Sequence, residues 1–130
     1  MFLSISENVS SQITLTETGG GTKKPGETLQ VTCIVSGFSL TDYSVLWIRQ
    51  APEKGLEWAG AIWTGGGNEY NSALQNRIKI TRNTSKKQVL LELSNLKPED
   101  TAMYYCTDTQ QGNLFQRPWT QSPMTFWQKK

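Results

Sequence analysis

The chain contains no histidine, only two cysteines and no long hydrophobic run in its 130 residues. Histidine is the commonest acid-base catalyst near neutral pH and a frequent metal ligand, so its absence argues against most hydrolases and metal sites. No nucleophile motif such as Gly-x-Ser-x-Gly is present either. No segment reaches the length of about 18 apolar residues that a membrane-spanning helix requires. We therefore predict a non-enzymatic chain with no catalytic residues, no cofactor, no metal ion and no membrane span.

A strong excess of charge of either sign is also missing. Lysine and arginine total 13 against 11 for aspartate and glutamate, a net charge of +2, and these side chains are scattered along the sequence. A nucleic acid or an anionic membrane normally binds a clustered basic patch. The sequence therefore indicates no nucleic-acid partner.

The two cysteines, Cys33 and Cys106, are separated by most of the chain and lie in alternating apolar segments. A metal or redox centre favours cysteines that are close in sequence and have further ligands nearby, whereas a structural disulfide tolerates a long separation. A disulfide that closes a loop of this length stabilises the folded state by about 4 kcal/mol. We therefore predict one structural disulfide and an oxidising, extracellular environment.

Short alternating segments separated by turn-forming residues run from Gln12 to Asp108. Between Leu29 and Val35, apolar side chains alternate with polar ones, as expected of a half-buried strand. Similar strand patterns occur at 43–50, 78–81, 89–93 and 101–107, and no segment shows a long amphipathic helical pattern. The sequence predicts an all-β antiparallel sandwich that forms one domain over residues 12–108.

Two glycine-rich segments, 19–21 and 65–67, allow a phosphate-binding loop as an alternative interpretation. Neither is followed by a Lys-Ser/Thr pair or by a helical pattern, both of which a phosphate-binding loop would need. We therefore interpret both segments as tight turns, and Thr64 to Asn68 as the tip of a hairpin.

Four residues at characteristic spacing point to a known family. Trp47 lies fourteen residues after Cys33, and Tyr104 lies two residues before Cys106. A buried tryptophan against an inter-sheet disulfide, with a tyrosine corner beside it, resembles the immunoglobulin sandwich. The resemblance implies that this tryptophan and this tyrosine belong to the core.

Longer segments resemble the frameworks of antibody heavy-chain variable domains. They are QITLTETGGGTKKPGETLQVTC, GFSLTDYSVLWIRQAPEKGLEWAGAIW and NRIKITRNTSKKQVLLELSNLKPEDTAMYYC. The resemblance implies a V-type immunoglobulin sandwich with Greek-key connections, and a structural ion pair between Arg77 and Asp100. A V-set domain of a T-cell receptor or another cell-surface recognition protein remains the alternative, although such domains rarely carry WIRQAPEKGLEW.

The resemblance implies a first working surface of three antigen-binding loops, at 37–44, at 63–70 and from Thr107 onward. The residues assigned to antigen binding are Asp42, Tyr43, Ser44, Trp63, Thr64, Asn68, Tyr70 and Asp108. Tyrosine and tryptophan offer a large rigid contact area at low entropic cost. For Trp63 and Tyr70, the alternative is that each ring packs beneath its own loop.

The second implied surface binds the variable domain of an immunoglobulin light chain. The positions that match this interface are Ile48, Gln50, Gly55, Leu56, Trp58 and Tyr105. Several are apolar or aromatic where a solitary domain would favour charge, which is typical of an interface. The resemblance also implies that the chain is secreted or displayed on the cell surface as part of an immunoglobulin.

Both ends of the chain depart from the family pattern. Residues 109–130 lack the aromatic-Gly-x-Gly motif of the last strand, so we expect an atypical tail, a last strand that is irregular or missing, and an open sheet edge. Residues 1–11 resemble neither a framework nor a complete leader, and we interpret them as a leader remnant. One hypothesis covers both ends: an unrearranged germline V segment read together with flanking non-coding DNA, never expressed as a functional binder in this form.

The acceptor motif for N-linked glycans, Asn-x-Ser/Thr, occurs at Asn8 and at Asn83. Asn83 lies in a segment of turn composition, 81–87, which predicts an exposed site that receives a glycan on secretion. Asn8 lies in the leader remnant, which we expect to be removed.

Overall fold

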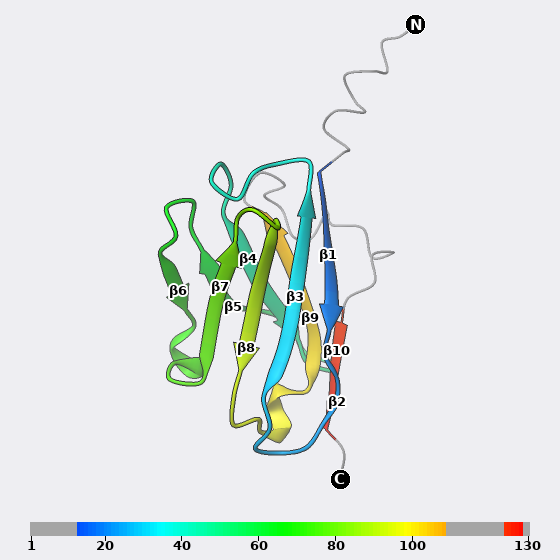
Figure 1. Cartoon of the computed structure of the whole chain (residues 1–130). Coiled ribbons are helices and arrows are strands. Elements are labelled where there is room, and N and C mark those ends of the chain that lie inside the picture. Colours follow the sequence, from blue (N-terminus) through cyan, green and yellow to red (C-terminus); the bar gives the residue numbers. More distant parts are fainter. Residues whose placement is uncertain (1–12, 109–123, 129–130) are drawn as a thin grey trace, which may run out of the picture.

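The computed structural model describes residues 13–108 and 124–128 and shows two β-sheets packed face to face (Figure 1). The strands are β1 (Thr14–Gly19), β2 (Gly21–Lys23), β3 (Leu29–Ser36), β4 (Val45–Gln50), β5 (Leu56–Ile62), β6 (Asn68–Tyr70), β7 (Ile78–Asn83), β8 (Gln88–Leu93), β9 (Ala102–Asp108) and β10 (Met124–Gln128). Two short 3-10 helices, η1 (Ser72–Leu74) and η2 (Pro98–Asp100), lie between strands. One sheet has the order β1-β3-β8-β7 and the other β2-β10-β9-β4-β5-β6. The predicted all-β two-sheet sandwich is confirmed.

Strand β3 shows how the alternating sequence produces the core. Its apolar residues Leu29, Val31, Cys33 and Val35 are at most 3% exposed, whereas the residues between them face outward. Full burial of an aliphatic side chain of this size stabilises the folded state by about 1.5–3 kcal/mol. Because both sheets turn such a face inward, the core lies between the two layers.

A disulfide between Cys33 and Cys106 joins the two sheets through the centre of the core. The cysteines lie on β3 and β9, 73 residues apart in sequence, with a Cα–Cα distance of 6.2 Å. Trp47 is fully buried on β4, directly opposite Cys106 in the antiparallel pairing of β4 with β9. The predicted disulfide and the buried tryptophan beside it are therefore confirmed.

The glycine-rich segment 19–21 carries the chain from one sheet to the other. Strand β1 ends at Gly19 in the four-stranded sheet, and β2 begins at Gly21 in the six-stranded sheet. Gly19 has a φ of 104°, and a Cβ atom added there would lie 2.6 Å from the carbonyl oxygen of Gln30. The segment is therefore a crossing between sheets, and at Gly19 only glycine fits it.

A last strand, β10, is present at the edge where we expected an opening. It pairs antiparallel with β9, with Met124 opposite Tyr104, and parallel with β2, with Phe126 opposite Gly21. A missing last strand with an open sheet edge is therefore a wrong expectation. Ladder pairing uses main-chain groups and the segment is rich in residues that favour extended structure, so the strand forms without the aromatic-Gly-x-Gly motif. The segment 1–11 with Asn8, predicted to be a leader remnant, lies outside the described residues, as do 109–123 and 129–130 of the predicted third loop and tail.

Candidate recognition surfaces

The first loop, residues 37–44, connects β3 to β4 at one end of the sandwich (Figure 1). Phe38 and Leu40 are buried and anchor this loop in the core. The ring of Tyr43 packs edge-on against the ring of Phe38, with 5.4 Å between the ring centroids. The hydroxyl groups of Ser39 and Thr41 are joined by a hydrogen bond of 2.8 Å. These contacts with the core and within the loop therefore fix the conformation of the first loop.

The second loop connects β5 to β6 at the same end, through a tight turn from Trp63 to Gly67 (Figure 1). The amide of Trp63 donates to the carbonyl of Gly67 at 2.7 Å, and the amide of Gly66 donates to the carbonyl of Trp63 at 2.8 Å. Gly66 has a φ of 98°, a conformation that glycine adopts without strain. The predicted hairpin tip is confirmed.

Arg82 on β7 connects these two loops, a role that the sequence analysis missed. Its Nη1 donates to the carbonyl of Leu40 in the first loop at 2.8 Å and to the carbonyl of Trp63 in the second at 3.2 Å. The guanidinium therefore holds the two loops at a fixed separation. Nothing in the sequence marks this arginine, because the contact joins three segments that only the folded chain brings together.

The residues predicted to bind antigen differ in their exposure. Asp42, Trp63, Thr64 and Asn68 are exposed. Ser44 is 7% exposed and Asp108 is fully buried, so neither presents its side chain at this end of the molecule. The exposed set lies on the first and second loops, and Trp63 at 37% exposure is its largest side chain.

The two tyrosines of the predicted set are half-buried and pack against the core. The hydroxyl of Tyr70 accepts the backbone amide of Ile80 at 3.1 Å, which ties the second loop to β7. For Tyr70, this contact favours packing beneath its own loop. Trp63, the other residue for which this alternative was open, stays exposed.

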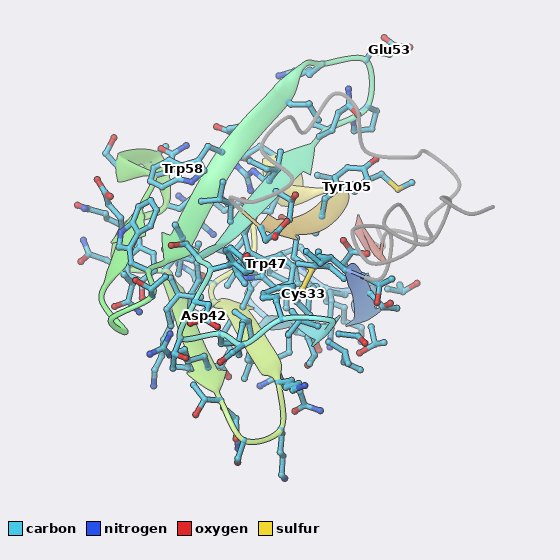
Figure 2. All side chains as sticks on the ribbon, turned by 90° about the horizontal axis from the view of Figure 1, so that it is seen from above. Cys33, Asp42, Trp47, Glu53, Trp58 and Tyr105 are labelled. Carbon is cyan, nitrogen blue, oxygen red and sulfur yellow. A yellow bond between two sulfur atoms is a disulfide. The ribbon has the colours of Figure 1, made fainter. Side chains whose placement is uncertain are left out.

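The residues predicted to bind a light chain gather on the outer face of the six-stranded sheet. Trp47 points into the core, so its neighbour Ile48 points outward, with Tyr105 opposite it on β9 and Trp58 opposite it on β5. Figure 2 looks along the sandwich from the loop end and shows Trp47 and Cys33 between the sheets, with Trp58 and Tyr105 farther out. These three outward residues form one row across the sheet.

A second row lies next to the first on the same face. Gln50 is paired with Leu56 on β5 and with Met103 on β9, and its side-chain amide donates to the carbonyl of Lys54 at 2.8 Å. Leu56 and Trp58 are half-exposed and Gly55 is exposed, whereas Ile48 and Tyr105 are buried. The structure therefore brings all six predicted positions to one face and the turn beside it, with Leu56 and Trp58 as its accessible apolar part.

The opposite end of the sandwich holds a buried ionic cluster around Asp100, which ends η2. Its carboxylate receives Arg77 Nη1 at 2.8 Å, Arg49 Nη1 at 2.9 Å and the amide of Lys97 at 2.9 Å. The hydroxyl of Tyr104 donates to the carbonyl of Asp100 at 2.7 Å. The ion pair of Arg77 with Asp100 and the tyrosine corner are therefore present as predicted, and Arg49 joins them.

Burial alone raises the pKa of Asp100, but hydrogen bonds from Arg77, from the Lys97 amide and from Arg49 outweigh it, so this pKa lies below its ordinary value. Burial raises the pKa of Tyr104 to about 12, with Arg49 opposing the rise. Both groups keep one protonation state near neutral pH, so the cluster is structural rather than catalytic.

Two buried charged side chains, Glu17 and Arg49, were missed by the sequence analysis. The carboxylate of Glu17 on β1 accepts the backbone amide of Cys106 at 2.7 Å and so links the two sheets beside the disulfide. Arg49, the second arginine on Asp100, also binds Glu57 at 2.8 Å. The alternation within β1 and β4 predicts that both side chains point inward, and a charged residue at an inward position is the signal that could have found them.

Known proteins match this chain over most of its length. The immunoglobulin V-set domain family matches residues 20–120. The mouse (Mus musculus) Ig heavy chain V region MOPC 141 is 53% identical over 96 residues, which cover 74% of this chain and 67% of that one. The Xenopus laevis Ig heavy chain V regions XIG8 and XIG14 are 49% identical over 112 residues (85% and 82% covered) and 54% identical over 93 residues (72% and 69% covered).

These matches define the class of protein: the chain belongs to the immunoglobulin V-set family. Within it, the chain belongs to the heavy-chain variable regions, because three such regions share about half of its residues over most of its length. This family is non-enzymatic, as predicted. In residues 13–108 and 124–128, no helix is long and apolar enough to cross a membrane.

Proposed function

We propose that the chain recognises antigen through the loop end of its sandwich, as part of an immunoglobulin. The observation that carries this proposal is the pair of anchored loops joined by Arg82, which present Asp42, Trp63 and Asn68 to solvent. A rigid loop loses little conformational entropy on binding, and an exposed indole supplies contact area at low entropic cost. Similarity to heavy-chain V regions supports the same function.

The test is selection of binders that use these loops. The chain is displayed together with a library of light-chain variable domains and selected against a panel of folded protein antigens. In the binders obtained, Trp63→Ala is expected to weaken antigen binding about tenfold or more, as removal of an aromatic contact typically does. Lys79→Ala, an exposed change on β7 away from the loops, is the matched control. Binders that tolerate Trp63→Ala and Asp42→Ala alike would contradict the proposal.

We further propose that the outer face of the six-stranded sheet binds a light-chain variable domain. The half-exposed side chains of Leu56 and Trp58 support this assignment, because the free energy falls when a partner covers apolar surface that would otherwise face water. Such pairing occurs in a secreted or cell-surface immunoglobulin, and the buried disulfide is consistent with that location.

Trp58→Ala is expected to weaken light-chain binding about thirtyfold, which corresponds to roughly 2 kcal/mol for loss of a central aromatic anchor. The control is Ile34→Ala, which removes an apolar side chain that is 40% exposed on the other sheet. The measurement is the dissociation constant of the heavy–light variable pair, by sedimentation equilibrium. Equal effects of the two substitutions would contradict the assignment of this face.

A further inference from the structure

The β7–β8 turn carries the sequence Asn83-Thr84-Ser85, and all three residues are exposed. The hydroxyl of Ser85 donates to the side-chain oxygen of Asn83 at 2.8 Å, and the amide of Lys86 donates to the same oxygen at 3.0 Å. Neither contact engages the amide nitrogen Nδ2, which is the atom that bears an N-linked glycan. The acceptor motif is therefore accessible, and its serine hydroxyl already lies against the asparagine that would be modified.

The side chain of Asn83 lies on the outer face of the four-stranded sheet. Along β7, Ile78 and Ile80 are buried, so Lys79, Thr81 and Asn83 occupy the opposite face. Asn83 is one of the residues that line a shallow hollow of about 200 Å³ on this face. Its lining residues are Thr32, Thr81, Arg82, Asn83, Gln88 and Leu90.

This hollow offers the two kinds of contact that a sugar ring uses. Leu90 supplies an apolar floor, and the hydroxyl groups of Thr32 and Thr81, which flank it in the strand pairing, supply hydrogen-bonding groups. Ile34, paired with Gln88 beside the hollow, is 40% exposed and is the most exposed large apolar side chain among the described residues. The face therefore has uncovered apolar area within reach of one asparagine.

We propose that Asn83 is an N-glycosylation site, and that the first sugars of its glycan cover this hollow and Ile34. In the reaction, Nδ2 forms a bond to C1 of N-acetylglucosamine and loses one proton. The bond between that carbon and the phosphate of a lipid-linked oligosaccharide breaks, and the lipid diphosphate leaves. The glycan projects from the four-stranded sheet, so the exposed residues of the first two loops and the outer face of the six-stranded sheet stay free.

This inference goes beyond the proposed function, since it requires passage through the secretory pathway but no antigen binding. The Arg82 contacts place the acceptor next to both loops without placing the Asn83 side chain between them. The β7–β8 turn lies at the same end of the sandwich as the two loops (Figure 1), and the outward direction of the Asn83 side chain leads the glycan over the four-stranded sheet.

The first test measures occupancy. The full chain, preceded by a secretory signal peptide, is expressed with a light chain in a vertebrate cell line, and the peptide containing Asn83 is analysed by mass spectrometry before and after peptide N-glycosidase. We expect conversion of Asn83 to aspartate on deglycosylation, loss of the glycan in Asn83→Gln and Ser85→Ala, and retention in the matched control Ser85→Thr. Peptide mapping separates this site from Asn8, and analysis of the cell lysate covers the case of poor secretion. An unmodified Asn83 in both fractions would overturn the proposal.

The second test measures where the glycan lies. Hydroxyl-radical labelling of the glycosylated and enzymatically deglycosylated protein is expected to show about twofold lower oxidation of Leu90 and Ile34 when the bulky glycan is present. Trp63 and Met103, which are 37% and 36% exposed on other surfaces, are expected to show no change. Unchanged labelling of Leu90 and Ile34, or protection of Trp63 instead, would overturn the proposed position of the glycan.

Discussion

Replacing Asp100 by asparagine is expected to lower the free energy of unfolding by about 3–5 kcal/mol at neutral pH, because it removes the buried counter-ion that Arg49 and Arg77 share. The side chain of Asp100 is fully buried, and those of Arg49 and Arg77 are 8% and 14% exposed. Asparagine has nearly the same shape, so the change removes charge with little loss of packing. The measurement is urea unfolding of the wild type and the variant.

The matched control for this prediction is Glu57→Gln. Glu57 binds the same Arg49, but its side chain is 45% exposed, so the expected loss is less than about 1 kcal/mol. A similar loss in both variants would contradict the view that burial of the charge is decisive.

The effect of Asp100→Asn should also depend on pH. The pKa of Asp100 is lowered in the folded chain, so its carboxylate stabilises the fold above the unfolded pKa of about 4, and this contribution is lost as the pH falls toward the folded pKa. The difference in unfolding free energy between wild type and variant is therefore expected to shrink below about pH 4. A difference that stays constant from pH 7 to pH 3 would show that charge is not its cause.

Replacing both Cys33 and Cys106 by alanine is expected to lower the free energy of unfolding by about 4 kcal/mol through the greater entropy of the unfolded chain. The bond joins strands 73 residues apart, and both cysteines are fully buried. A single domain typically has only about 5–15 kcal/mol of stability in total, so a large share of the wild-type stability would be lost. Urea unfolding and the secreted yield are the two measurements.

A control separates the covalent bond from the packing of the sulfur atoms. When the wild-type protein is unfolded by urea in the presence of a reducing agent, it keeps both cysteine side chains but lacks the bond. Its loss of stability relative to the oxidised protein is expected to be nearly as large as that of the double variant. A reduced protein as stable as the oxidised one would contradict the assignment of the stabilisation to the disulfide.

The features that sequence analysis predicted are those carried by spacing and alternation. Trp47 and Tyr104 stand at characteristic distances from the cysteines, and an apolar side chain at every second position marks a strand face wherever the partner strand lies. The Arg77–Asp100 pair came from the resemblance to a family and not from any local signal. The expectation of a missing last strand came from the absence of a family motif, and it failed because a strand forms by main-chain pairing, which requires no such motif.

The sequence by itself determined the fold class, through alternation within each strand, and the disulfide, because Cys33 and Cys106 are its only cysteines; the two candidate surfaces came from the resemblance to heavy-chain variable domains. Only the tertiary structure decided that Arg82 joins two loops, that Arg49 shares Asp100 with Arg77, and that Ser44 is buried. Those contacts join segments that are distant in the chain. They depend on the distance and angle between the two sheets, which the sequence of a single segment does not specify.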